Sequence, residues 1–219
     1  MKKRMVVFFI LSMMILTVAS CFAQNPVEMV ERTLHINIPT LSLLTDNNAY
    51  NQINNRLYDE SYRLLKGSSV DVEQDFSDTN VIDYYSQATM TYQNSRMISF
   101  QMDQYLYPYR SAHGSHLFLG FVFDLVTGTP LTLHDLFLVN DGFIQTVNGF
   151  MNQTIKENDI PVFDFTPFKG LDDTIEFYLK ESELVIVYQE YAYTPYSYGP
   201  LIFTIPLHDL TSFLNPNYF

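Results

Sequence analysis

Two histidines and two aspartates in the middle of the chain are of residue types that can bind a metal ion. His113 and His116 are three residues apart, and Asp124 and Asp135 follow them. Two imidazoles and a carboxylate could hold a metal that activates water, which would make the protein a metal-assisted cell-wall hydrolase. Histidines three apart face one ion only in a helix or tight turn, and Gly114 with its neighbouring turn residues disfavours a helix. We therefore favour a structural histidine beside a turn, and keep the hydrolase using His113, His116 and Asp124 as the alternative.

Nucleophilic catalysis finds little support in the chain. Ser111 and Ser115 flank His113, but a serine needs an activating base that the fold brings from elsewhere. The sequence contains no nucleophile-elbow pattern. We accordingly expect a non-catalytic protein with no catalytic residue, no cofactor and no metal site.

Residues 188–200 are rich in tyrosine and offer a different kind of chemistry, which is recognition. Two apolar runs with strand composition, 184–188 and 201–205, flank this stretch. Pro195, Gly199 and Pro200 exclude a helix and a two-residue hairpin, so a long loop is predicted. Tyrosine supplies a large contact area and a polar tip with only two torsions to freeze. We predict a ligand-binding surface formed by His113, Tyr191, Tyr193, Tyr196 and Tyr198; the alternative is that these rings cover a sheet edge.

The elements that must position these residues mix strands and helices. We predict a hairpin of strands 82–92 and 96–107, then a strongly apolar strand 117–125 that we expect to be central. Amphipathic helices are predicted from an Asp46 cap to about residue 66 and from an Asp141 cap to residue 155. Thr132 and Asp135 form a capping box. The predicted fold class is α+β, with an antiparallel sheet or sheets packed by two helices.

The N-terminus has the features of an export signal. Lys2, Lys3 and Arg4 precede an apolar run, and residues 18–21 (Val-Ala-Ser-Cys) resemble the lipobox of bacterial lipoproteins. We favour lipidation of Cys21, the single cysteine, over ordinary cleavage after Ala23. The expected organisation is a signal at 1–23, an N-terminal α+β subdomain at 24–110 and a C-terminal one at 111–219. The expected location is the cell envelope, with a lipid anchor in the membrane.

The charge of the chain restricts its partners. The net charge is −12, and removal of Lys2, Lys3 and Arg4 with the signal would make it −15. Nucleic-acid phosphates would be repelled by such a chain, so no nucleic-acid partner is expected. A cationic partner would be attracted over a long range, although plain solubility also explains the charge.

Two blocks of residues carry a family resemblance. The first contains Ala-His-Gly at 112–114, Phe-Asp-Leu-x-Thr-Gly at 123–128 and Leu-x-Asp-Leu-Phe at 133–137; the second is the tyrosine stretch 191–200 with Phe-x-Ile-Pro at 203–206. Together they resemble the extracytoplasmic domain of the lysozyme-sensing anti-sigma-V factor and of the N-terminal part of a peptidoglycan deacetylase. The resemblance implies a non-catalytic α+β domain outside the cytoplasm, whose partner is a basic protein such as lysozyme or a cell-wall component. Arg110-Ser111 stands where that family commonly has Gly-Gly.

Overall fold

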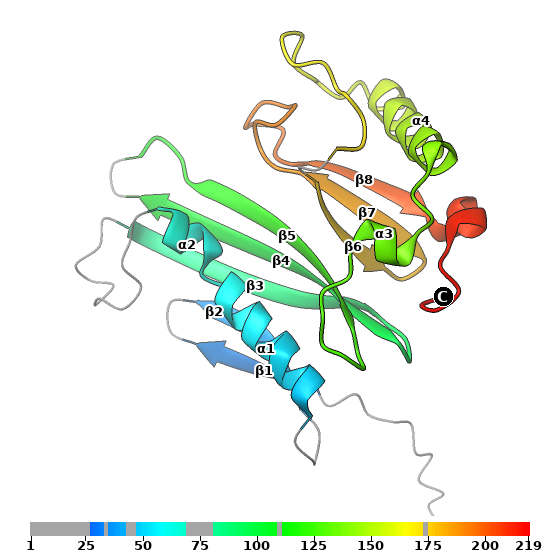
Figure 1. Cartoon of the computed structure of the whole chain (residues 1–219). Coiled ribbons are helices and arrows are strands. Elements are labelled where there is room, and N and C mark those ends of the chain that lie inside the picture. Colours follow the sequence, from blue (N-terminus) through cyan, green and yellow to red (C-terminus); the bar gives the residue numbers. More distant parts are fainter. Residues whose placement is uncertain (1–26, 33–34, 43–46, 69–80, 109–110, 173–174) are drawn as a thin grey trace, which may run out of the picture.

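The protein is a two-sheet α+β structure, as predicted (Figure 1). The computed structural model describes residues 27–32, 35–42, 47–68, 81–108, 111–172 and 175–219. The predicted signal, Cys21 and Asp46 lie outside these residues. The elements in chain order are β1 (Val27–Arg32), β2 (Ile36–Leu41), α1 (Asn48–Glu60), α2 (Arg63–Gly67), β3 (Val81–Gln93), β4 (Met97–Pro108), β5 (Ser115–Asp124), α3 (Leu133–Leu136), α4 (Asp141–Glu157), β6 (Glu176–Lys180), β7 (Glu183–Tyr188), β8 (Leu201–Pro206) and the 3-10 helix η2 (Leu207–Phe213).

The first sheet has the order β1-β2-β3-β4-β5, and α1 and α2 lie across one of its faces (Figure 1). All pairs are antiparallel except β2–β3, which is parallel. Ile53 and Leu57 of α1, one helical turn apart, are fully buried against the sheet. The hairpin predicted for residues 82–107 is confirmed as β3 and β4.

The first helix differs from the prediction at both ends. Its N-cap is Asn47, whose side chain accepts hydrogen bonds from the backbone N–H groups of Ala49 and Tyr50. The predicted cap at Asp46 is therefore wrong. The helix also ends at Glu60, with Ser61 as its C-cap, and α2 begins separately at Arg63.

The second sheet contains β6, β7 and β8 in that order, all antiparallel, and α4 packs on it (Figure 1). Phe143, Val147 and Met151 recur every four residues along α4 and are fully buried. The cap of α4 is Asn140, which accepts from the Phe143 N–H, so the predicted cap at Asp141 is wrong by one position. The capping box predicted for α3 is confirmed.

The two sheets meet along β5 and β6. A Cβ at Gly120 would lie 2.0 Å from the carbonyl oxygen of Phe177, so only glycine allows this approach. The Ser99 hydroxyl accepts a hydrogen bond from the Leu179 N–H at 2.9 Å, and the Thr91 hydroxyl donates to the Leu179 carbonyl at 2.6 Å. The predicted boundary between the N-terminal and C-terminal subdomains, at residues 110 and 111, lies between β4 and β5, which are neighbours in one sheet.

Strand β5 is apolar but not central, which corrects the prediction. It lies at the edge of the first sheet. Phe121 and Phe123 pack under the helix layer, whereas Val122 packs into the core of the second sheet. The strand is apolar because both of its faces are covered, and such coverage gives an edge strand the composition of a central one.

No helix within the described ranges is long and apolar enough to cross a membrane.

Candidate aromatic binding site

The loop between β7 and β8 contains the tyrosines singled out in the sequence and divides them into two groups. Tyr188 and Tyr193 are 0% and 6% exposed, whereas Tyr191 and Tyr198 are 54% and 44% exposed. Tyr196 is half-buried. The loop therefore has an inward half and an outward half, although all five residues are of one type.

The inward half belongs to the core of the second sheet. The Tyr188 hydroxyl donates to the Gly170 carbonyl at 2.7 Å, and the Tyr193 hydroxyl donates to the Asp172 carboxylate at 3.1 Å. Phe168 packs edge-to-face against both rings, with centroid distances of 5.5 and 5.1 Å. Burial raises the pKa of both tyrosines, and the Asp172 carboxylate raises them further. The predicted role of Tyr193 as a surface contact is corrected, because its ring is enclosed.

The outward half meets the turn before β5. The Tyr196 ring stacks on His113 with a centroid distance of 4.1 Å and an interplanar angle of 28°. The Tyr191 and Tyr196 rings are stacked at 5.8 Å. We call His113, Tyr191 and Tyr196 the aromatic patch. The fold thus brings together three of the residues singled out in the sequence from two segments that are almost eighty positions apart, and Tyr198 lies exposed further along the same loop.

The histidine of this patch is held in one tautomer. His113 Nδ1 lies 2.8 Å from the Gly114 carbonyl oxygen, which can only accept, so Nδ1 carries the proton. Nε2 is then an acceptor, and the Tyr191 hydroxyl donates to it at 3.4 Å. The exposed ring of Tyr191 is therefore orientated by His113 rather than by core packing.

The backbone at Tyr191 is strained. Its φ is +64°, a left-handed conformation that favours glycine or asparagine and is uncommon for a bulky residue. The Ala192 N–H donates to the Gln189 carbonyl at 3.1 Å, which closes a turn with Tyr191 at its third position. Such a conformation costs a non-glycine residue about 1 kcal/mol or more. The sequence thus places a large ring where the backbone alone would favour glycine.

Gln189 fastens the loop to the first sheet. Its side-chain oxygen accepts from the Phe118 N–H at 3.0 Å, and its side-chain nitrogen donates to the Phe118 carbonyl at 2.5 Å. These bonds satisfy backbone groups on the outer edge of β5, which would otherwise be open to pairing with another strand. The loop is consequently fixed relative to the His113 turn.

A second group of rings continues the patch across the first sheet, on the face opposite α1 and α2. Tyr85 stacks on Tyr105 at 5.8 Å, Tyr105 packs against His116 at 4.7 Å, and His116 stacks on Phe118 at 5.8 Å. We call these four residues the aromatic row. Tyr105 also lies directly under the turn, since a Cβ at Gly114 would be 2.2 Å from its ring. The row and the patch therefore form one continuous surface.

The aromatic row was not predicted as a site, although the residue pattern of β3 indicates a polar and aromatic outer face. Residues 83, 85, 87 and 89 of β3 are Asp, Tyr, Gln and Thr, so the outer face of the hairpin is polar and aromatic. The Tyr85 hydroxyl donates to the Asp103 carboxylate at 2.8 Å, and burial together with this carboxylate raises the pKa of Tyr85. Asp103 therefore keeps the hydroxyl protonated and the ring in place.

The residues of the hydrolase alternative do not meet. Asp124 is eight positions along β5 from His116, which corresponds to about 26 Å in an extended strand. Its carboxylate instead accepts from the N–H groups of Val126 and Thr127 at 2.7 and 3.0 Å, which builds a turn. Within the described residues, no three His, Cys, Asp or Glu side chains are grouped to hold a metal ion.

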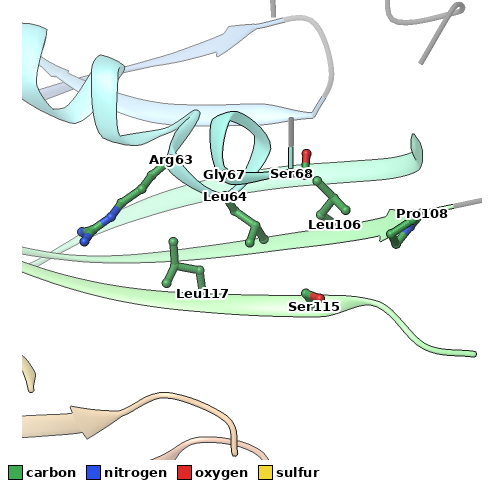
Figure 2. A pocket seen from close by; sticks show the side chains of 8 residues that line it. All are labelled: Arg63, Leu64, Gly67, Ser68, Leu106, Pro108, Ser115 and Leu117. Atoms are coloured by element: carbon green, nitrogen blue, oxygen red, sulfur yellow. The ribbon is translucent and has the colours of Figure 1, made fainter. Parts of the chain in front are cut away.

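A separate cavity of about 500 Å³ lies on the helix side of the first sheet (Figure 2). Leu64 of α2 points toward Leu106 and Leu117 of the strands below it. The Arg63 guanidinium on the rim lies 3.6 Å from a carboxylate oxygen of Glu60 and 3.6 Å from one of Glu176. Its charge is therefore neutralised within the protein, and the cavity offers mainly apolar walls.

One stretch of the chain is similar to a known protein family. Residues 134–208 match the model of a family described as "Protein of unknown function (DUF3298)". The matched stretch contains α4, the second sheet and the tyrosine loop. It excludes His113 and the aromatic row. No curated protein matches the chain.

Two crystal structures of DUF3298 proteins share the fold. One, from Pseudomonas aeruginosa PAO1, has a TM-score of 0.66 and 19% identity, and the match covers 89% of this chain and 96% of that one. The other, from Bacteroides fragilis NCTC 9343, has a TM-score of 0.60 and 19% identity, with 87% and 93% covered. The two-sheet architecture therefore recurs outside this chain. Neither description names an anti-sigma factor or a deacetylase, so that resemblance stays a prediction.

Proposed function

We propose that the chain is an exported, lipid-anchored cell-envelope protein that binds a ligand through the aromatic patch and does not catalyse a reaction. The observation that carries the proposal is the display of Tyr191. Its ring is the most exposed of the loop tyrosines, its backbone is strained, and His113 and Tyr196 orientate it. Local strain that the fold maintains without a packing benefit is typical of a functional position.

The partner class follows from charge and from the family resemblance. A net charge of −12 attracts a basic protein such as lysozyme, and a neutral cell-wall component is not repelled. Glu190, adjacent to Tyr191, adds a carboxylate beside the rings. Both partners are compatible with an aromatic surface, on which tyrosine contributes contact area and hydroxyl groups.

The proposal is tested by co-sedimentation of the purified full chain with cell-wall fragments and by capture on immobilised lysozyme. Replacing both His113 and Tyr196 with Ala should weaken the binding at least tenfold, because Tyr191 would then be the only member of the aromatic patch left. The matched control is Tyr58→Ala, which removes an exposed ring from α1 on the other face of the sheet. Equal binding by both variants would exclude the patch as the binding site.

The lipid anchor is tested separately. Cys21→Ala should move the protein from the membrane fraction to the soluble fraction, because the proposed acceptor of the lipid is gone. An unchanged distribution would refute lipidation and leave the binding proposal intact.

A further inference from the structure

On the face of the first sheet opposite α1 and α2, the part that the second sheet leaves uncovered has a composition that restricts its ligand. Cross-strand partners share a face, and two lines of partners cross the sheet on this side, one from β3 to β5 and one from β2 to β5. One line contains Tyr85, Tyr105 and His116. The other contains Asn37, Gln87 and Asp103 and ends at Phe118, which packs against Val185 and Val187 of the second sheet. The members are aromatic rings, amides, one imidazole and one carboxylate, with no aliphatic side chain among them. A face that is only solvated would not need stacked rings, and the aliphatic side chains with which a face packs on another layer are absent from the β2, β3 and β4 members of these two lines.

One end of this face is hollowed. A depression of about 220 Å³ is lined by His35, Asn37, Tyr85 and Gln87. Asn37 and Gln87 are paired across the parallel β2–β3 contact, and His35 is fixed beside them because its carbonyl accepts from the Ser86 N–H at 3.3 Å. Whole-ligand pockets usually measure about 300 to 1,000 Å³, so this hollow has room for one unit of a longer molecule.

The charge of the face points to a neutral ligand. Strands β2, β3, β4 and β5 contain no Lys or Arg. An anionic ligand would meet the negative field of the whole chain and the Asp103 carboxylate, which lies 3.7 Å from the His116 imidazole, and these four strands have no Lys or Arg to compensate. The amides of Asn37 and Gln87 both donate and accept hydrogen bonds, and so do the tyrosine hydroxyls. Such groups match hydroxyl groups, which also donate and accept.

The length of the surface points to a linear ligand. The hollow adjoins Tyr85, the aromatic row leads from Tyr85 to the ring of Tyr105 beneath Gly114, and the patch begins at the neighbouring His113. The path therefore crosses three strands and ends at Tyr191. Rings along a sheet, with hydrogen-bonding groups between them, suit a chain of repeating units that each have an apolar and a hydroxylated side.

We infer that this face binds a neutral linear glycan, with one sugar unit in the hollow at Gln87 and the following units along the aromatic row toward Tyr191. The inference rests on the proposed function, because the patch forms one end of the site. It extends that function by naming the ligand class and by assigning Asn37, Tyr85, Gln87 and Tyr105 to binding.

The test is calorimetric titration of the purified full chain with tetrasaccharides of cellulose and chitin, and with their disaccharides. The tetrasaccharide of at least one series should bind at least tenfold more tightly than its disaccharide, because it spans both the hollow and the row. Tyr85→Ala and Gln87→Ala should each weaken it at least tenfold. Their matched controls on α1, Tyr58→Ala and Gln52→Ala, should leave it unchanged.

Several results would overturn the inference. Tetrasaccharide binding that is insensitive to Tyr85→Ala and Gln87→Ala would place the glycan elsewhere. Binding of polylysine but of no oligosaccharide, with loss in Tyr191→Gly, would refute the glycan and keep the proposed function. No binding of glycan, lysozyme, cell-wall fragments or polylysine would refute both.

Discussion

The two halves of the tyrosine loop differ in what holds each ring. Tyr188 and Tyr193 are enclosed by Phe168 and by each other, and each hydroxyl has a fixed acceptor. Tyr191 and Tyr196 are held by an imidazole at the surface, and the Tyr191 backbone is strained. The same residue type thus stabilises the fold in one half and is displayed at a cost to stability in the other. This difference distinguishes a packing role from a binding role without any knowledge of the ligand.

Removing an enclosed ring should have the largest effect. Tyr188→Ala should lower the free energy of unfolding by about 3 to 5 kcal/mol, because it leaves a cavity among Phe168, Tyr193 and Phe203. Urea unfolding followed by circular dichroism measures the change. A loss below about 1 kcal/mol would mean that this half of the loop is not part of the core.

High pH should act on the same two enclosed rings, together with the other tyrosines whose pKa burial raises, such as Tyr84 and Tyr85. The pKa values of Tyr188 and Tyr193 are raised above the ordinary value of 10.0, chiefly by burial. The unfolded state therefore loses these protons first, and stability that is fully present below about pH 10 should fall as pH rises, by up to about 1.4 kcal/mol per pH unit and per group. Urea midpoints at rising pH measure this, and Tyr193→Phe should reduce the slope. A flat profile would contradict the assigned burial.

A smaller effect is expected from the Tyr193 hydroxyl alone. Tyr193→Phe keeps the ring contacts and removes the hydrogen bond to Asp172. It should lower the free energy of unfolding by about 1 to 2 kcal/mol, and leave ligand binding unchanged, since this ring does not reach the surface. Weaker binding with unchanged stability would reverse the assignment of the two halves.

The smallest effect on stability is expected for the displayed ring. Tyr191→Gly removes an exposed side chain and relieves the left-handed backbone, so the free energy of unfolding should stay within about 1 kcal/mol of the wild-type value or rise. A loss of several kcal/mol in urea unfolding would show that the Tyr191 ring holds the loop in place.

Much of the fold was predictable, because local patterns determine it. Alternation identified the β3–β4 hairpin, and the apolar runs 184–188 and 201–205 identified β7 and β8 as strands. The position of β5 was not predictable, because coverage by the second sheet depends on contacts between distant residues such as Gly120 and Phe177. The caps predicted for α1 and α4 were each displaced by one position, since Asp and Asn are nearly equal as caps and adjacent candidates compete.

The site was predictable only in part for a similar reason. Residue type identified His113, Tyr191 and Tyr196, which the fold brings together. Tyr191 and Tyr193 are two residues apart and would share a side in an extended chain. The positive φ at Tyr191 interrupts that alternation, so one ring faces solvent and the other the core. Such a turn is invisible in the sequence, because tyrosine is not a residue that normally occupies it.

The most direct test of the account compares Tyr191→Gly with Tyr193→Phe in one experiment, measuring both the urea midpoint and the binding to cell-wall fragments and lysozyme. The account predicts that Tyr191→Gly keeps its stability and binds at least tenfold more weakly than wild type. It predicts that Tyr193→Phe loses stability and binds normally. Wild-type binding by a folded Tyr191→Gly protein would contradict the claim that the displayed tyrosine serves recognition.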